Sequence, residues 1–210
     1  MTIELWLAFT AASIILLMIP GPTILLVLSY ALAHGKKVAV ATASGVALGD
    51  LIAMTASLAG LGALMVSSAA AFTIVKWLGA LYLIWLGVSM IRKSGTAQAV
   101  LPQNTPEAAP ATMFRHAALV TALNPKSIAF FVAFVPQFLN PQAALGPQAA
   151  ILIATFVGLA ALNALAYALL AARLRAQITR PSVLRWLARA GGGTLIAMGL
   201  ATAATRRAAI

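Results

Sequence analysis

The fold is decided by residues 3–33, IELWLAFTAASIILLMIPGPTILLVLSYALA, an apolar stretch with Pro20-Gly21-Pro22 near its middle. The stretch is longer than the roughly 20 residues that a helix needs to cross a bilayer. It has no basic segment before the apolar run and no convincing cleavage site, so we interpret it as a retained membrane segment rather than a signal peptide. Proline removes a helical hydrogen bond and clashes with the preceding turn, so the triplet predicts an interrupted helix.

The composition of the whole chain also indicates a membrane protein. Of 210 residues, 62% are hydrophobic and 8% are charged, whereas soluble domains carry about 25% charged residues. Long apolar runs favour helices over a barrel of short alternating strands. We therefore predict an all-α integral membrane protein with six transmembrane segments, at about Ile3–Ala33, Val38–Val66, Phe72–Ile91, Met113–Leu139, Gln148–Ala172 and Ala190–Ala204.

A polar stretch divides the chain near its middle. Between the third and fourth segments, residues 93–110 combine a glycine and three prolines with Ser, Thr, Gln and Asn, which is typical of a linker. Asn124-Pro125 interrupts the fourth segment as Pro-Gly-Pro interrupts the first. The sequence thus predicts two inverted three-helix repeats with broken first and fourth helices, a common plan for secondary transporters. We predict a first half at 1–92, a cytoplasmic linker at 93–112 and a second half at 113–210.

Asp50 is the only acidic residue deep within the apolar segments, because Glu4 lies near the N-terminus and Glu107 in the linker. A carboxylate at membrane depth costs a few kcal/mol, so such groups usually face a bundle interior or a water-filled path. Gly45 and Gly49 precede it at a spacing that allows close helix approach. We therefore predict a role for Asp50 in binding substrate or protons, with a packing role as the alternative.

Three polar residues inside the later segments are further candidates for binding substrate or protons: Asn124, Lys126 and Asn163. Lys126 is expected to be either a substrate ligand or a lysine whose amine snorkels to the cytoplasmic interface. Asn163 is expected either to satisfy an exposed carbonyl group or to contact substrate. The helix breaks are expected to open a cavity, with simple packing kinks as the alternative.

Depth within the membrane shows whether these residues can share one site. Counted along each helix from its cytoplasmic end at about 1.5 Å per residue, Pro22, Asp50, Lys126 and Asn163 all lie between about 15 and 20 Å deep. Half of the hydrocarbon core is about 15 Å. All four elements are therefore predicted near the midplane, where transporters with inverted repeats bind substrate.

The chain resembles the LysE/RhtB family of amino-acid exporters over essentially its whole length. The resemblance is carried by residues 19–22 (IPGP), 44–50 (SGVALGD), 76–80 (KWLGA) through Leu86-Gly87, and 123–126 (LNPK) followed by 134–138. It implies a multi-pass protein of the bacterial inner membrane that exports amino acids or close derivatives in exchange for protons. The positions that match the family's characteristic ones are Pro20, Gly21, Pro22, Gly45, Gly49, Asp50, Asn124, Pro125 and Lys126; Asn163 has no such match.

Other classes of protein fit the sequence less well. An enzyme would need a nucleophile with a base, paired carboxylates or a metal, and Asp50 is the single carboxylate deep inside the segments. No metal site or cofactor is expected, because the chain has no cysteine and its two histidines lie at segment edges. Nucleic acid is not expected as a partner, because the basic residues are scattered at helix ends. An exporter of another small solute or metal ion, a non-transporting structural subunit and a homo-oligomeric assembly stay open.

The distribution of basic residues predicts that both termini face the periplasm, because short loops rich in Lys and Arg stay cytoplasmic. Ten basic residues fall on one side, namely Lys36, Lys37, Arg92, Lys93, Arg115, Arg173, Arg175, Arg180, Arg185 and Arg189, and three on the other, namely Lys76, Arg206 and Arg207. Reporter fusions after Gly95 and after the last residue should report a cytoplasmic linker and a periplasmic C-terminus. The reverse pattern would overturn the assignment.

Overall fold

The computed structural model describes residues 1–94, 109–140, 142–178 and 180–204, and every regular element in them is helical. This confirms the predicted all-α class. The elements are α1 (Ile3–Met18), α2 (Pro22–His34), the 3₁₀ turn η1 (Gly35–Val38), α3 (Ala39–Ser67), α4 (Ala69–Lys93), α5 (Pro110–Ala122), α6 (Pro125–Ala129), the π-helical turn η3 (Phe130–Phe134), the 3₁₀ turn η4 (Val135–Phe138), α7 (Leu145–Ile178) and α8 (Pro181–Ala204).

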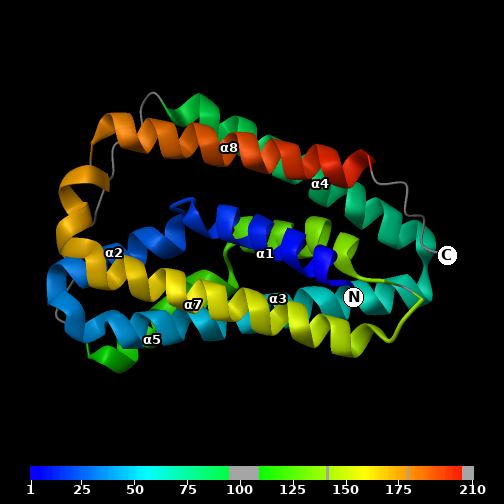
Figure 1. Ribbon diagram of the computed structural model, residues 1–210, viewed down its shortest axis with the longest axis horizontal. Helices are drawn as coiled ribbons and strands as arrows, with labels where there is room; N and C mark the ends of the chain where they lie inside the picture. The colour runs from blue at the N-terminus through cyan, green and yellow to red at the C-terminus, as the bar shows by residue number, and fades with distance from the viewer. Residues whose placement is uncertain (95–108, 141, 179, 205–210) are drawn as a thin grey trace.

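Four stretches of the described chain are long and apolar enough to cross a membrane: Pro22–Leu64, Ala70–Lys93, Pro110–Phe138 and Leu145–Ala171. Helix α1 has 16 residues and is shorter than these. It lies end to end with α2 along the long axis of the molecule (Figure 1). Helix α8 is not among the four, and it carries two arginines in its first half. The number of six membrane segments therefore stays a prediction.

The first helix is broken where the sequence predicts. Helix α1 ends at Met18 and α2 begins at Pro22, with extended backbone at Ile19 and Gly21. Pro22 takes the first position of α2, where its missing N–H has no helical partner to lose. The break leaves the last carbonyl groups of α1 without the N–H partners that a continuing helix would supply.

The second break lies at the junction of α5 and α6. Helix α5 ends at Ala122, and Pro125 takes the first position of α6. Asn124 caps α6, because its side-chain oxygen accepts a hydrogen bond of 3.1 Å from the Lys126 backbone N–H. The five-residue helix α6 then continues into η3 and η4, where Pro136 cannot donate to the turn before it.

The long helices form two groups on either side of α1 and η3. Helices α4 and α8 run side by side along one face, and α3 packs against α5 and α7 in the other group (Figure 1). Buried phenylalanines connect the middle layer to the second group: Phe9 of α1 stacks on Phe130 of η3, and Phe130 and Phe131 contact Phe156 of α7. The central layer is therefore anchored to α7 by aromatic packing.

Glycines bring helix backbones together at two crossings. Gly45 and Gly49 of α3 face α5, and a Cβ atom on Gly49 would lie 2.5 Å from the carbonyl oxygen of Ala118. A Cβ atom on Gly192 of α8 would lie 2.5 Å from the carbonyl oxygen of Gly87 in α4. Side chains larger than hydrogen would force these helix pairs apart, as at other close crossings of membrane helices.

The division into two halves, 1–92 and 113–210, stays a prediction. The order of elements supports it, because each half holds a broken helix followed by two long helices. Helix α4 extends to Lys93 and α5 begins at Pro110, so the two ends of the expected linker are helical. Residues 95–108, with Glu107, lie outside the described residues.

The ends of the elements also bear on topology. The start of α1 and the described end of α8 lie toward one end of the long axis (Figure 1). The turn η1, the end of α4 and the start of α5 lie toward the opposite end. Lys36 and Lys37 belong to η1, and Arg92 and Lys93 close α4. Arg206 and Arg207 lie outside the described residues. The arrangement supports termini on one side of the membrane, and the assignment of that side to the periplasm stays a prediction.

The α3–α5 crossing gives a test of the glycine contacts. We expect Gly49→Ala to lower the free energy of unfolding by about 1–3 kcal/mol, because the added methyl group overpacks the crossing. Gly60→Ala is the matched control on the same helix, because a Cβ atom there meets nothing within 4 Å. Thermal unfolding of both variants in detergent measures the difference. Equal stability of the two variants would contradict the close contact.

Candidate functional site

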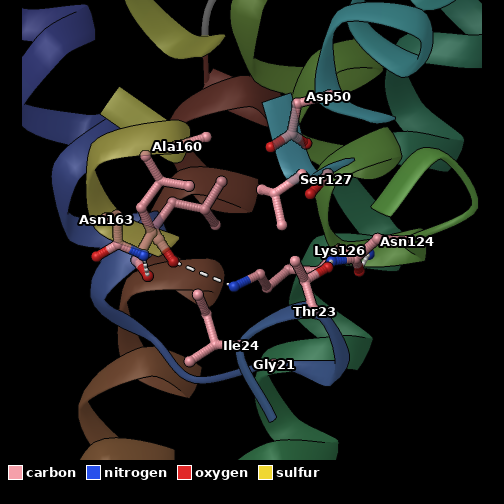
Figure 2. Close-up of a pocket in the computed structure, with 12 residues that line it drawn as sticks. Gly21, Thr23, Ile24, Asp50, Asn124, Lys126, Ser127, Ala160 and Asn163 are labelled. Carbon is pink, nitrogen blue, oxygen red and sulfur yellow. Dashed lines mark hydrogen bonds between the residues drawn. The ribbon is translucent and has the colours of Figure 1, made fainter. Parts of the chain in front are cut away.

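The two breaks meet at a pocket in the interior of the protein (Figure 2). The four residues predicted to bind substrate or protons all line it. The lining residues are Leu16, Leu17, Gly21, Thr23, Ile24, Val46, Asp50, Asn124, Lys126, Ser127, Ala160 and Asn163. The cavity has a volume of about 20 Å³. That volume holds a water molecule and is far too small for an amino acid.

Side chains from α6 and α7 cap the open end of α1. Lys126 Nζ donates to the carbonyl oxygen of Leu16 at 3.1 Å and to that of Ile19 at 2.9 Å. Asn163 Nδ2 donates to the carbonyl oxygen of Leu17 at 3.1 Å. In the next turn of α7, the Tyr167 hydroxyl donates to the carbonyl oxygen of Met18 at 3.2 Å. The last carbonyl groups of α1 are thus satisfied one by one, as a helix end within a membrane requires.

These contacts bear on the alternatives expected for Lys126 and Asn163. Lys126 does not snorkel, because its amine turns inward to the end of α1 (Figure 2). Asn163 satisfies an exposed carbonyl group, which was one of its two expected roles. Both residues also line the pocket, so a contact with substrate stays a prediction for each.

The N-terminal ends of α2 and α6 are tied together at the pocket. Asn124 Nδ2 donates to Thr23 Oγ1 at 3.1 Å, and Thr121 Oγ1 lies 3.4 Å from the same atom. Gly21, which precedes α2, offers no side-chain cap to the helix. The backbone N–H groups of the first turn of α2 therefore give this side of the pocket a positive partial charge, opposite to the carbonyl end of α1.

Asp50 contributes a buried carboxyl group from α3. The residue is 2% exposed, and its Oδ1 atom has no hydrogen-bond partner among the described residues. Figure 2 shows the carboxyl group pointing into the pocket, with Ser127 between it and Lys126. Lys126 is near enough to interact with it electrostatically. A buried polar atom without a partner is costly, so Oδ1 is a candidate position for a proton or a bound cation.

The remaining predicted positions frame this site. Pro20 and Pro22 enclose the break beside Gly21, and Pro125 begins α6. Gly49 directly precedes Asp50 on α3, Gly45 lies one helical turn before Gly49, and both face α5. Sequence reasoning missed Thr23, Ser127, Thr121 and Tyr167. Thr23 directly follows Pro22, and Ser127 directly follows Lys126. Their position next to predicted site residues was the signal that could have found them.

Apolar helices of membrane-spanning length thus surround an interior pocket that is lined by polar groups of both signs. The comparisons identify the kind of protein. Residues 14–205 match the LysE type translocators, and the chain belongs to that family.

Relatives with efflux functions match much or all of the chain. A homoserine/homoserine lactone efflux protein of Salmonella typhimurium is 35% identical over 99% of this chain and 100% of its own length. A leucine efflux protein of Klebsiella pneumoniae is 34% identical over 66% of this chain and 65% of its own length. An uncharacterized membrane protein of Vibrio cholerae is 32% identical over 98% of this chain and its full length. No solved structure matches the chain.

The hydrogen bond from the Tyr167 hydroxyl to the carbonyl oxygen of Met18 can be tested by removing the hydroxyl group. We expect Tyr167→Phe to lower the free energy of unfolding by about 1 kcal/mol, because it leaves the carbonyl group of Met18 without its donor. Tyr82→Phe is the matched control, because no hydrogen bond of the Tyr82 hydroxyl occurs in the described structure. Thermal unfolding in detergent measures both. A larger loss in Tyr82→Phe than in Tyr167→Phe would count against the cap.

Proposed function

We propose that this protein exports an amino acid or a close derivative from a bacterial cytoplasm across the inner membrane. The observation that carries the proposal is the pocket at the two helix breaks, where a carbonyl helix end and a carboxyl group lie near the start of another helix. An amino-acid zwitterion carries one charge of each sign on neighbouring atoms. Its ammonium group suits the end of α1 and Asp50, and its carboxylate suits the start of α2 and Lys126.

The names of the relatives support an ammonium group as the shared feature of the substrates. Leucine, homoserine and homoserine lactone differ in side chain, and the lactone has no free carboxylate, but all three carry an α-amino group. A site built from backbone carbonyl oxygens and a carboxyl group recognises that amino group without reading the side chain. We therefore propose small neutral amino acids and their derivatives as the substrate class.

Asp50 provides a means of coupling export to protons. A carboxyl group can hold either a proton or the substrate's ammonium group, so the two ligands compete for one negative charge. Entering protons then drive substrate out when the outside pH is lower. A negative interior adds about 2.3 kcal/mol per 100 mV for each charge that enters. The protein thus acts as a proton antiporter.

The alternatives differ in what they require of the pocket. A metal-ion exporter would present several ligands together, and the described residues contain no group of three or more His, Cys, Asp or Glu side chains that could hold a metal. A structural subunit would have no need of a buried carboxyl group that lacks a partner. The polar pocket therefore favours export of an organic cation or zwitterion.

Efflux from proteoliposomes tests the function directly. Purified protein is reconstituted, vesicles are loaded with labelled leucine, homoserine or other neutral amino acids, and efflux is followed with and without a pH gradient. We expect efflux of at least one of them to rise several-fold when the side receiving substrate is acidic. Protein-free vesicles give the background rate. Rates equal to this background for the whole panel would refute the proposed function.

Asp50→Asn tests the coupling mechanism. The change keeps size and hydrogen bonding but removes the charge, so the variant should insert and fold. We expect its pH-gradient-driven efflux rate to fall at least about 10-fold, which corresponds to roughly 1.4 kcal/mol. Glu4→Gln is the matched control, because Glu4 is exposed at the start of α1, far along the helix from the pocket. Wild-type efflux and pH dependence in Asp50→Asn would place proton coupling at another residue.

A further inference from the structure

The Lys126 side chain ends in the same chemical group as the proposed substrate. Its Nζ atom lies 3.1 Å from the carbonyl oxygen of Leu16 and 2.9 Å from that of Ile19, within hydrogen-bond range of both. A substrate ammonium group would seek these same oxygens, since they end α1 at the pocket and carry its negative partial charge. The structure therefore displays an ammonium position already filled by a side chain of the protein.

The rest of the pocket holds a buried carboxyl oxygen that lacks a hydrogen-bond donor among the described residues. Asp50 is 2% exposed and faces the pocket, with Oδ1 unpaired among the described residues. The free space of about 20 Å³ admits water but no amino acid. A substrate can therefore enter only if a group that now fills the pocket moves out of the way, and the long flexible stem of Lys126 makes it the group able to do so.

We propose that the carbonyl oxygens of Leu16 and Ile19 form the ammonium subsite of the transport site, and that Lys126 occupies this subsite as an internal competitor until substrate displaces it. This inference rests on the proposed function, since it assigns a position to the amino group of the exported compound. Asp50 lies on the other side of the pocket and completes the subsite as the charged acceptor.

Displacement explains how one lysine serves two states. In the empty protein, its amine donates to the carbonyl oxygens of Leu16 and Ile19 at the end of α1. In the loaded protein, the substrate's ammonium group takes over the cap, and the released lysine can pair with the substrate's carboxylate. A ligand with an ammonium group but no carboxylate must displace Lys126 without giving it a new partner, and so binds weakly.

The displacement model and a simple capping role predict opposite changes in the affinity for an ammonium ligand when Lys126 is removed. If Lys126 only caps α1, its removal loosens the site and weakens every ligand. If Lys126 competes for the subsite, its removal frees two carbonyl oxygens, and a ligand that carries only an ammonium group binds more tightly. Two fragments of leucine separate these outcomes: isopentylammonium, which lacks the carboxylate, and 4-methylpentanoate, which lacks the ammonium group.

We expect Lys126→Met to bind isopentylammonium at least 10-fold more tightly than the wild type, and 4-methylpentanoate no more tightly. Titration calorimetry on purified protein in detergent measures both dissociation constants. Lys36→Met is the matched control, because Lys36 is exposed in η1 outside the pocket, and it should bind both fragments as the wild type does. Lys126→Gln, which is shorter and uncharged, should show the same sign and decides the matter if Lys126→Met does not fold.

Isopentylammonium binding that is unchanged, weaker or undetectable in the Lys126 variants would overturn the subsite. Equal tightening of both fragments would also overturn it, because it would reflect a general loosening of the pocket. Efflux of amino acids by the wild-type protein, measured separately in proteoliposomes, reports on the proposed function alone. Active efflux together with unchanged fragment binding would therefore refute the subsite and leave the exporter assignment intact.

Discussion

The structure depends on one constraint, which is that the carbonyl end of α1 lies in the interior of a membrane protein and must find hydrogen-bond donors there. Water is scarce at that depth, and the helix cannot continue through Pro20-Gly21-Pro22. Lys126, Asn163 and Tyr167 supply the donors. The positions of α6 and α7 relative to α1 follow from this need, and so does the meeting of the two breaks at one pocket.

The scaffold around the pocket is held by contacts that leave little freedom. Gly49 of α3 brings the backbone of α5 close, and Gly87 and Gly192 do the same for α4 and α8. Asp50, one residue beyond Gly49, is thereby held against the α5–α6 break rather than in lipid. Asp50 thus sits on a helix fixed by backbone contact, while the long side chain of Lys126 provides the freedom to move.

Much of this arrangement could be predicted from the sequence, because its causes are local. The breaks follow from the proline ring, the all-α class from the length of the apolar runs, and the shared depth of Asp50, Lys126 and Asn163 from the rise per helical residue. Depth is a single coordinate, however, so it could not tell which carbonyl each donor meets, nor that Lys126 turns inward. Tyr167 and Thr23 escaped notice because tyrosine and threonine are ordinary residues in membrane helices, and only the folded chain places them beside a helix end.

The caps on α1 have a consequence for the biogenesis of the protein. Lys126 is separated from Leu16 by 110 positions along the chain, and Tyr167 from Met18 by 149. At a synthesis rate of about 5–20 residues per second, the donors leave the ribosome roughly 5 to 30 s after the acceptors. During that interval the only local donor at the end of α1 in the described structure is the Ile19 N–H, which lies 3.3 Å from the carbonyl oxygen of Leu16. The capping of the first helix to be made is therefore completed only after most of the chain has been synthesised.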